Sequence, residues 1–223
     1  GRRKFSNKTA LDNVSFAIQP GRIIGLLGPN GSGKSTSIKM INGLLQPDSG
    51  QVLIKGNTPS IESKKIISYL PERTYLNDWM TVSQILSFFE DFYEDFDSNR
   101  AKEMLTSLGI DENAKLKTLS KGTKEKVQLI LVMSRKAELY VLDEPIGGVD
   151  PAARDYILST IIQNYSESSS ILISTHLIQD VEKILDDVIL INNGQIYMTG
   201  SVDDIRSENG ISIDNLFREV FRC

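Results

Sequence analysis

Long apolar runs are missing from this sequence. The most apolar stretches, such as 127–133, are far shorter than the ~18 residues that a membrane-spanning helix requires. We therefore expect a chain that does not cross a membrane by itself. Cysteine is nearly absent as well. Cys223 is the only one, which excludes an internal disulfide and is typical of proteins from a reducing compartment such as the cytoplasm.

An excess of positive charge is also missing. The sequence carries 25 Lys and Arg against 29 Asp and Glu, a formal net charge of −4. Binding to nucleic acid usually requires a basic face, so this balance argues against broad nucleic-acid binding. What is present, 223 residues of which 40% are hydrophobic, suffices for a globular chain with a substantial core.

Short apolar runs alternate with helical patterns along the chain. Strands are predicted at 10–18, 22–27, 51–55, 139–142 and 171–173. The segment 188–198 is predicted as a β-hairpin, because Asn193-Gly194 readily adopts the positive φ of a tight hairpin turn. A helix that includes Ile38, Ile41 and Leu44 is expected after the second strand. Strands that alternate with helices predict an α/β fold with a mostly parallel sheet.

A separate helical region is predicted in the middle of the chain. Val82, Ile85 and Leu86 recur at helical spacing, and a second helical pattern follows up to Gly109. We expect an α/β core at about 1–77 and 136–202, a helical subdomain at about 78–135 and a C-terminal helical tail at about 203–223. The acidic and aromatic stretch 88–96 either packs inside the helical subdomain, as aromatic stripes usually do, or partly lines a groove for a partner's helix.

The strongest motif is a glycine-rich loop between an apolar strand and a helical pattern. Its residues match G-x-x-x-x-G-K-[ST]: Gly28, Pro29, Asn30, Gly31, Ser32, Gly33, Lys34, Ser35 and Thr36. Glycines let the backbone wrap around phosphates, and the N–H groups at a helix N-terminus point at the anion. Lys34 is expected to reach the β- and γ-phosphates, and the Ser35 hydroxyl to ligate Mg²⁺. The loop therefore predicts an ATP site.

Two carboxylates end the apolar run 139–142. Asp143 and Glu144 are thereby delivered to the carboxyl edge of the sheet, where ligands of open α/β sheets bind. Asp143 is expected to hold Mg²⁺ directly or through water, and Glu144 to accept a proton from an attacking water. Taken alone, the pair is equally a solvated strand end. Beside the glycine-rich loop, ATP hydrolysis is favoured.

Two further candidates lie at the ends of predicted elements. His176, the only histidine, follows the apolar strand directly. A lone histidine is more often a surface or core residue, but this position favours a contact with the γ-phosphate. Ser120, with Gly122 close behind, lies at a predicted helix N-terminus. This Ser either caps the helix or contributes to an anion site there.

In this order and spacing, these elements resemble the ATP-binding cassette (ABC) family over essentially the whole chain. GPNGSGKST resembles its Walker A motif, LYVLDEP its Walker B motif with the catalytic glutamate, LSKGT its signature loop and STH its switch histidine. The segment that ends in Asp150 resembles the D-loop, which places Asp150 at the nucleotide. Phe5 stands where the family has an aromatic that stacks on adenine. The segment YLPER and the acidic-aromatic helix are most similar to bacterial cassettes of the ABC-2 export type.

The resemblance implies a P-loop NTPase (RecA-like) core with a mostly parallel sheet, an antiparallel β subdomain and an α-helical subdomain. It also implies an ATPase in which two cassettes, identical or different, close head to tail around ATP and Mg²⁺. Ser120 and Gly122 would then contact the γ-phosphate that the other subunit binds. Hydrolysis would drive a separate transmembrane permease subunit, which would hold the chain at the cytoplasmic face of the cell membrane.

Three positions depart from the family pattern. Lys121 and Thr123 replace a Gly and the Gln of the usual LSGGQ signature, which allows a heterodimer with unequal sites. Glu72 stands where the family has the glutamine of its Q-loop. As a carboxylate it can still coordinate Mg²⁺, but it adds negative charge beside the phosphates. Phe5 is preceded by little or no first strand, so a tyrosine before Gly1 is the alternative adenine platform.

Three other functions compete with transport. A translation or DNA-repair cassette would typically carry a second cassette or a long coiled coil, and no sustained heptads lie between Lys34 and Ser120. A GTPase or small-molecule kinase is disfavoured because the segment 7–10, NKTA, is not the guanine-reading N-K-x-D and precedes the loop. A regulatory module without hydrolysis would be expected to lose Glu144 or His176. The sequence therefore predicts an ATP-hydrolysing transporter subunit.

Overall fold

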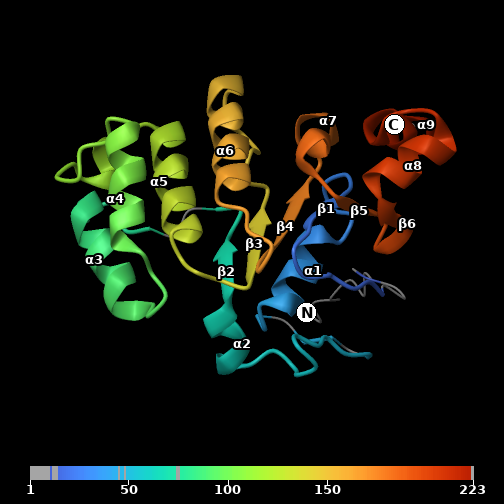
Figure 1. Cartoon of the computed structure of the whole chain (residues 1–223), viewed down its shortest axis with the longest axis horizontal. Coiled ribbons are helices and arrows are strands. Elements are labelled where there is room, and N and C mark those ends of the chain that lie inside the picture. Colours follow the sequence, from blue (N-terminus) through green and yellow to red (C-terminus); the bar gives the residue numbers. More distant parts are fainter. Residues whose placement is uncertain (1–10, 12–14, 45, 48, 74–75, 222–223) are drawn as a thin grey trace, which may run out of the picture.

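A six-stranded sheet forms the centre of the molecule (Figure 1). The computed structural model describes residues 11, 15–44, 46–47, 49–73 and 76–221. The strands are β1 (Ile23–Leu27), β2 (Ile67–Leu70), β3 (Leu139–Asp143), β4 (Ser170–Thr175), β5 (Asp187–Asn192) and β6 (Gln195–Ser201). Their order is β2-β3-β4-β1-β5-β6, and every neighbouring pair is parallel except β5–β6, which is antiparallel. The mostly parallel sheet predicted from the sequence is confirmed.

Helices cover both faces of the sheet. They are α1 (Lys34–Ile41), α2 (Ile61–Ile66), α3 (Val82–Phe92), α4 (Ser98–Ser107), α5 (Lys121–Met133), α6 (Pro151–Gln163), α7 (Ile178–Val181), α8 (Val202–Asn209) and α9 (Ile213–Val220), with 3₁₀ turns η1 (Leu116–Thr118) and η2 (Glu182–Ile184). Helices α6 to α9 and part of α5 pack on one face, and α1 packs on the other. In Figure 1, α3 and α4 lie beyond α5, outside the β2 edge of the sheet.

β1 is buried on both faces between β4 and β5. Ile23 and Leu27 pack on the α6 face, whereas Ile24 and Leu26 pack on the α1 face. Successive side chains of a strand point to opposite faces, so a strand covered on both sides needs an uninterrupted apolar run. The run at 23–27 meets this need, and all five of its residues are buried. The loop that follows β1 therefore leaves the middle of the sheet.

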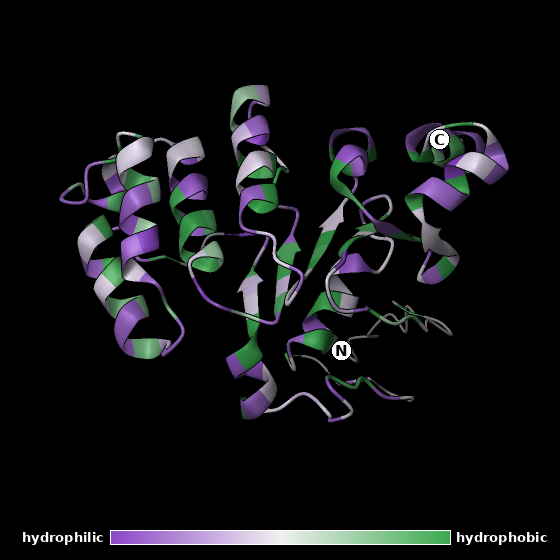
Figure 2. Ribbon diagram, viewed as in Figure 1, coloured by the Kyte–Doolittle hydropathy of each residue, from purple (hydrophilic) through white to green (hydrophobic). Residues whose placement is uncertain are grey.

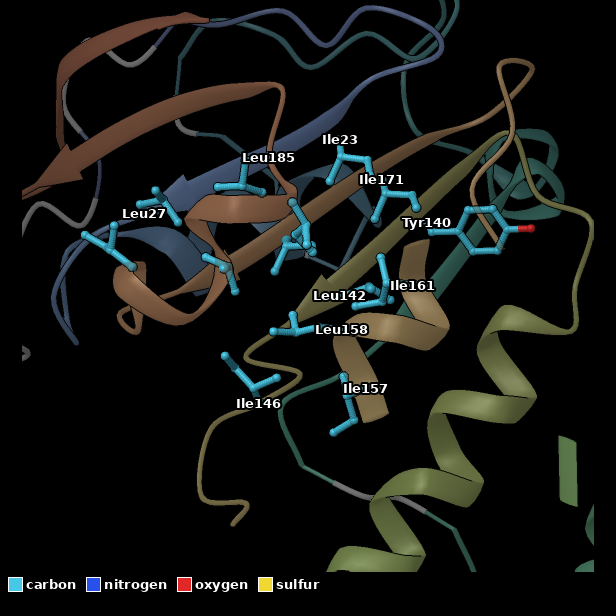
Figure 3. Close-up of a cluster of buried hydrophobic side chains, with 14 of the residues drawn as sticks. Ile23, Leu27, Tyr140, Leu142, Ile146, Ile157, Leu158, Ile161, Ile171 and Leu185 are labelled. Atoms are coloured by element: carbon cyan, nitrogen blue, oxygen red, sulfur yellow. The ribbon is translucent and has the colours of Figure 1, made fainter. Parts of the chain in front are cut away.

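The larger core cluster lies on the α6 face (Figure 3). Tyr140 and Leu142 of β3 and Ile171 of β4 gather there with Ile157 and Ile161 of α6, and each of the five is 4% exposed or less. Burial of large apolar side chains is the main favourable term in folding. This packing holds α6 against β3 and β4, and thereby fixes both ends of the segment that joins β3 to α6.

A second apolar cluster belongs to α3, α4 and α5, which we call the helical lobe. Val82 and Ile85 of α3, Leu105 of α4 and Ile130 of α5 are members, each at most 2% exposed. Figure 2 shows polar and apolar residues mixed along these helices, as expected for helices that bury one side only. The lobe therefore has a core of its own beside that of the sheet.

The aromatic stretch 88–96 divides between the two expected environments. Phe96 is buried in the core of the helical lobe, and Phe89 and Tyr93 pack against that core. Phe88 and Phe92 are 57% and 67% exposed, and their rings stack with centroids 6.0 Å apart. One side of the stretch therefore builds the lobe, and the other presents two aromatic rings on its surface.

Two predicted strands are wrong. Residues 15–18 form no strand, while 10 and 12–14 lie outside the described residues. At 51–55, Ile54 pairs with Asn57 in an isolated bridge, and Leu53 is 50% exposed. A strand needs a partner along its length, and no described segment supplies one here. Within the described residues, the antiparallel pair of strands is instead β5 and β6, and the other antiparallel pairings are isolated bridges. Their turn, Asn193-Gly194, has the predicted positive φ angles of 50° and 73°.

The helix after the glycine-rich loop is shorter than predicted. α1 ends at Ile41, and Gly43 follows with a φ of 70°. The N–H groups of Gly43 and Leu44 turn back to carbonyls in the last turn of the helix, and this left-handed glycine arrangement terminates it. Leu44 is consequently 60% exposed. None of the described helices combines the length and the apolar composition needed to span a membrane.

Candidate active site

Three strands end side by side at the edge of the sheet where the candidate residues gather. Leu27 at the end of β1 lies opposite Thr175 of β4, and Asp143 at the end of β3 lies opposite Ser174 of β4. The glycine-rich loop, the two carboxylates and His176 therefore leave the sheet at neighbouring points. This is the carboxyl edge, where ligands of open α/β sheets bind.

The loop 28–33 is held tightly to the strands beside it. A Cβ at Gly28 would lie 2.1 Å from the carbonyl oxygen of Ile191, so only glycine fits there. Gly33 precedes α1 with a φ of 109°, a conformation that residues with a Cβ rarely adopt. The N–H of Gly194, in the β5–β6 turn, donates to the carbonyl of Ser32 at 2.9 Å. These contacts fix the loop's path into the helix N-terminus.

Lys34 opens α1 and is buried, with 5% of its surface exposed. Its Nζ donates to the carbonyl oxygen of Gly28 at 2.7 Å and to the next carbonyl at 2.9 Å. Burial lowers the pKa of Lys34, while the carboxylates of Glu144, Asp143 and Glu72 act in the opposite direction. The ammonium group therefore lies inside the loop and within electrostatic range of three carboxylates.

Two further features of the loop fit an anion. The Ser32 hydroxyl is buried and has no hydrogen-bond partner among the described residues. Leaving such a group unpaired costs about 1–3 kcal/mol, which a phosphate oxygen in the loop would relieve. At Gly31, an added Cβ would meet no described atom within 4 Å, so the tip of the loop is open. Ser35 is exposed and Thr36 is half-buried in the first turn of α1.

Asp143 is buried at the end of β3, with 5% of its surface exposed. The hydroxyl of Ser174 donates to its Oδ1 at 2.5 Å. Burial raises the pKa of Asp143. The charges of Glu72 and Glu144 raise it further, whereas the Ser174 hydrogen bond and Lys34 lower it. A carboxylate in this position favours a cation beside it.

Glu144 turns its side chain onto the end of β4. Its φ of 48° is left-handed, which is uncommon for a residue with a Cβ. Oε2 accepts from the Thr175 hydroxyl at 3.0 Å, and Oε1 accepts from the His176 backbone N–H at 3.2 Å. The Nδ1 atom of His176 lies 3.0 Å from the same Oε1. Because a carboxylate only accepts, this contact is a hydrogen bond when Nδ1 carries the proton. The structure thus brings Glu144 and His176 together as a pair.

The expected magnesium ligands are only partly assembled. Asp143 is buried at the edge, whereas Ser35 and Glu72 are exposed. In the described part of the chain, no group of three or more His, Cys, Asp or Glu side chains is arranged to hold a metal ion. Mg²⁺ usually keeps several waters and binds through one or two carboxylates together with phosphate oxygens. The residues present therefore fit a metal whose coordination a nucleotide completes.

The signature residues lie apart from this group. Ser120 is exposed and caps α5, its hydroxyl accepting from the Thr123 N–H at 3.2 Å. Gly122 faces open space, since a Cβ there would meet no described atom within 4 Å. α5 packs next to β2, and β3 and β4 separate β2 from β1 and its loop. The helix-capping interpretation of Ser120 is confirmed, and the turn lies away from the chain's own glycine-rich loop.

Asp150 also caps a helix. Its Oδ1 accepts from the Ala153 N–H at 2.8 Å at the start of α6, where Pro151 occupies the first helical position. Phe5 lies outside the described residues. Sequence reasoning overlooked Ser174 and Thr175, whose hydroxyls bond to the two carboxylates. Their signal is positional, since both end the apolar strand just before His176.

The model of the family described as "ABC transporter" matches residues 11–147. The linearmycin resistance ATP-binding protein LnrL of Bacillus subtilis (strain 168) is 32% identical over 94% of this chain and 70% of its own length. The ABC-type transporter ATP-binding protein EcsA of the same organism is 29% identical over 97% of this chain and 92% of its length. A solved ATP-binding subunit of an ABC transporter superposes with a TM-score of 0.86 at 29% identity, covering 97% of this chain and 95% of that one.

Proposed function

The chain belongs to the ABC transporter family, and from that premise we propose which of its residues bind and hydrolyse ATP. As a member, it is an ATP-binding subunit with ATPase activity that drives transport by a separate membrane subunit. One observation carries the assignment of residues. Lys34, Asp143, Glu144 and His176, which are far apart in the sequence, meet at one edge of the sheet.

ATP binds in the loop formed by residues 28–36. The backbone N–H groups of the loop and the N-terminus of α1 receive the phosphates, and the Lys34 ammonium moves from the loop carbonyls to the phosphate oxygens. The hydroxyl of Ser32 gains the partner that it lacks among the described residues. These contacts all bind the triphosphate part of ATP. The adenine ring stacks outside the loop, with Phe5 as its proposed partner.

Glu144 accepts a proton from the water that attacks the γ-phosphate, and His176 orients Glu144. The contacts from Thr175 and His176 already aim both Glu144 oxygens at the end of β4. When Nδ1 of His176 carries the proton, it donates to Glu144, and Nε2 is the ring atom left for the proposed contact with the γ-phosphate. The pair thus supplies a base and a group that holds the base in place.

Ser35 and Asp143 would hold Mg²⁺, with Glu72 beside them. When bound, the ion neutralises charge on the β- and γ-phosphate oxygens. The burial of Asp143 beside two other carboxylates is unfavourable for the chain alone. A divalent cation offsets this repulsion, which favours binding of ATP together with its metal.

A second ABC subunit, identical or different, completes the site with its own Ser120 and Gly122, and Asp150 lies at the contact between the two subunits. The open space around Gly122 and the exposure of Ser120 support this arrangement. A permease subunit holds the chain at the cytoplasmic face of the membrane. The division into a core at about 1–77 and 136–202, a helical subdomain at about 78–135 and a tail at about 203–223 is part of the same proposal.

Replacement of the base tests this account. Glu144→Gln keeps the size of the side chain and an acceptor oxygen but removes the basic carboxylate. Turnover of ATP should fall on the order of 10²- to 10⁴-fold, with the affinity for ATP retained. Glu138→Gln, the same change at the opposite end of β3, is the control and should leave turnover unaltered. Normal hydrolysis by Glu144→Gln would show that Glu144 is not the base.

A further inference from the structure

Two segments lead away from the proposed catalytic pair. Residues 145–150 join Glu144 to α6, and α7 follows His176 after a single residue. The contact between Glu144 and His176 joins the two segments at the sheet edge. Beyond the edge, neither segment belongs to the sheet, so side chains must hold one segment against the other.

Arg154, in the first turn of α6, reaches both segments. Its Nε donates to the carbonyl oxygen of Val149 at 3.1 Å, and its Nη1 donates to Oδ2 of Asp180 at 3.3 Å. Val149 belongs to the segment after Glu144, and Asp180 belongs to α7, the helix after His176. A single guanidinium group therefore bridges the two segments.

The chain between Glu144 and Arg154 has little freedom. The N–H of Gly147 donates to the carbonyl oxygen of Glu144 at 3.2 Å, and Asp150 caps α6. Val149 is 8% exposed, and α6 is packed on the sheet core. A shift of α7 relative to α6 would therefore be transmitted to the segment that carries Glu144, through the bonds of Arg154.

We propose that Arg154 is a positioning residue that fixes the segment after Glu144 to the helix after His176 and so holds the pair in the geometry that hydrolysis needs. The inference rests on the proposed function, because that function gives Glu144 and His176 their roles. Arginine suits the task since its planar guanidinium presents donors in two fixed directions, which the ammonium of lysine does not.

The ion pair itself contributes little to stability. The side chains of Arg154 and Asp180 are 28% and 38% exposed, and pairs of this kind are screened by water. Loss of the bridge should therefore act on geometry and local motion more than on the global free energy of unfolding. This difference separates a positioning role from a purely structural one.

Arg154→Met removes both donors and tests the bridge. Amide hydrogen exchange should become faster in 145–150 and in 177–181 together, because both segments lose the same tether. The kcat for ATP hydrolysis should fall by about tenfold, with ATP affinity unchanged, since misplacement of a reacting group by a fraction of an ångström has effects on this scale. Arg154→Lys should recover only part of the loss.

Arg22→Met is the matched control. It removes another partly exposed Arg–Asp pair, that of Arg22 with Asp187, at the opposite end of β1. It should change neither the exchange of the two segments nor kcat. In a double-mutant cycle, Asp180→Asn should lower kcat in the wild type and have little further effect in Arg154→Met, because the two residues act through one contact.

The outcomes separate the inference from the function on which it rests. If wild-type protein hydrolyses ATP and Arg154→Met matches Arg22→Met within about twofold in kcat, with unchanged exchange in both segments, the positioning role is wrong. If exchange rises in one segment only, Arg154 does not bridge them, and the proposal also fails. If wild-type protein does not hydrolyse ATP, the proposed function fails. A joint rise in exchange would then still support the bridge.

Discussion

The carboxyl edge of the sheet and the signature turn of the helical lobe are both proposed to contact ATP, yet they are built differently. At the sheet edge, strand register gathers Lys34, which follows β1, with Asp143 and Glu144 at the end of β3, and each of the three is held by hydrogen bonds. In the signature turn, 119–123, Ser120 is exposed, and a Cβ at Gly122 would meet no described atom within 4 Å. The side chains at the sheet edge are thus already held in place, whereas the signature turn presents an open surface.

The difference supports the proposal that the two regions contact different nucleotides. If the signature turn contacted the nucleotide bound by its own chain, it would lie beside the loop 28–36. Instead, β3 and β4 separate the strand that α5 contacts from β1. The two regions are still connected within the chain, since the Nζ of Lys121 lies 3.4 Å from where a Cβ at Gly148 would be. The lysine that departs from the family signature therefore points toward the segment after Glu144.

The largest effect is expected from a charge in the signature turn. Gly122→Asp should lower ATP turnover at least about 100-fold. The aspartate would face the γ-phosphate bound by the partner, and such like charges cost several kcal/mol when they are brought together. ATP affinity of the isolated chain, measured by direct titration, should not change. Asn113→Asp adds the same charge elsewhere on the helical lobe and should be neutral. Loss of ATP affinity in Gly122→Asp would place the turn in the chain's own site.

A smaller effect, on stability and not on turnover, is expected where the helical lobe joins the sheet. Arg135 is buried and forms a bidentate pair with Asp95. It also donates to the carbonyls of Lys65 in α2 and Ile67 at the start of β2, and lies over the ring of Tyr93. Arg135→Met should lower the free energy of unfolding by about 3 kcal/mol, because it leaves Asp95 without its partner.

Chemical denaturation measures this loss, and a surface pair of the same lobe provides the control. Lys124→Met removes the contact with Asp78, whose side chain is 62% exposed, and should cost about 0.5 kcal/mol or less. Equal effects of Arg135→Met and Lys124→Met would show that Arg135 does not hold the lobe to the sheet.

The smallest effect is expected at the sheet edge, where a substitution should raise the stability of the chain and not lower it. Because burial and its neighbours raise the pKa of Asp143, the folded chain holds that proton more tightly than the unfolded chain does. The ionised form therefore destabilises the fold above this raised pKa, and the penalty disappears as the pH falls. Without nucleotide or metal, Asp143→Asn should raise the Tm by about a few °C at neutral pH, and the gain should shrink in acid.

A carboxylate with a cationic partner supplies the comparison. Asp187→Asn weakens the pair with Arg22 and should lower the Tm instead. A lower Tm for Asp143→Asn at neutral pH would contradict the view that the edge is held in an unfavourable charge state ready for Mg²⁺.

The same contrast explains what the sequence could and could not predict. The sequence predicts four parts of the site: the loop 28–36, Asp143, Glu144 and His176. Each lies next to an apolar strand, and parallel strands bring their ends to one edge of the sheet. For Ser120 the local sequence leaves a helix cap and an anion site equally open, since its proposed ligand lies on another chain. Contacts between distant elements cannot be predicted from the sequence in this way. Arg154 and Arg135 act across elements far apart in sequence, and no local pattern marks their partners.

The errors in the predicted strands and helices have physical causes. The pattern at 51–55 is typical of a strand, but a strand forms only where a neighbour pairs with it, and pairing is not visible in a single segment. β2 is the reverse case. The run 67–70 is short and contains Ser68, yet it becomes a strand because β3 pairs with it. α1 ends early because Gly43 provides a left-handed stop that apolar spacing alone does not reveal.

A mixing experiment tests most directly the claim that the site is shared between two chains. Glu144→Gln lacks the proposed base, and Gly122→Asp lacks a working signature turn, so each should be inactive alone. In a mixed dimer, one site combines the intact Glu144 of one chain with the intact Gly122 of the other. The account predicts that an equimolar mixture recovers ATP hydrolysis well above the sum of the separate variants. Activity no greater than that sum, with both variants folded and binding ATP and with the wild-type chain active as a dimer on its own, would contradict it.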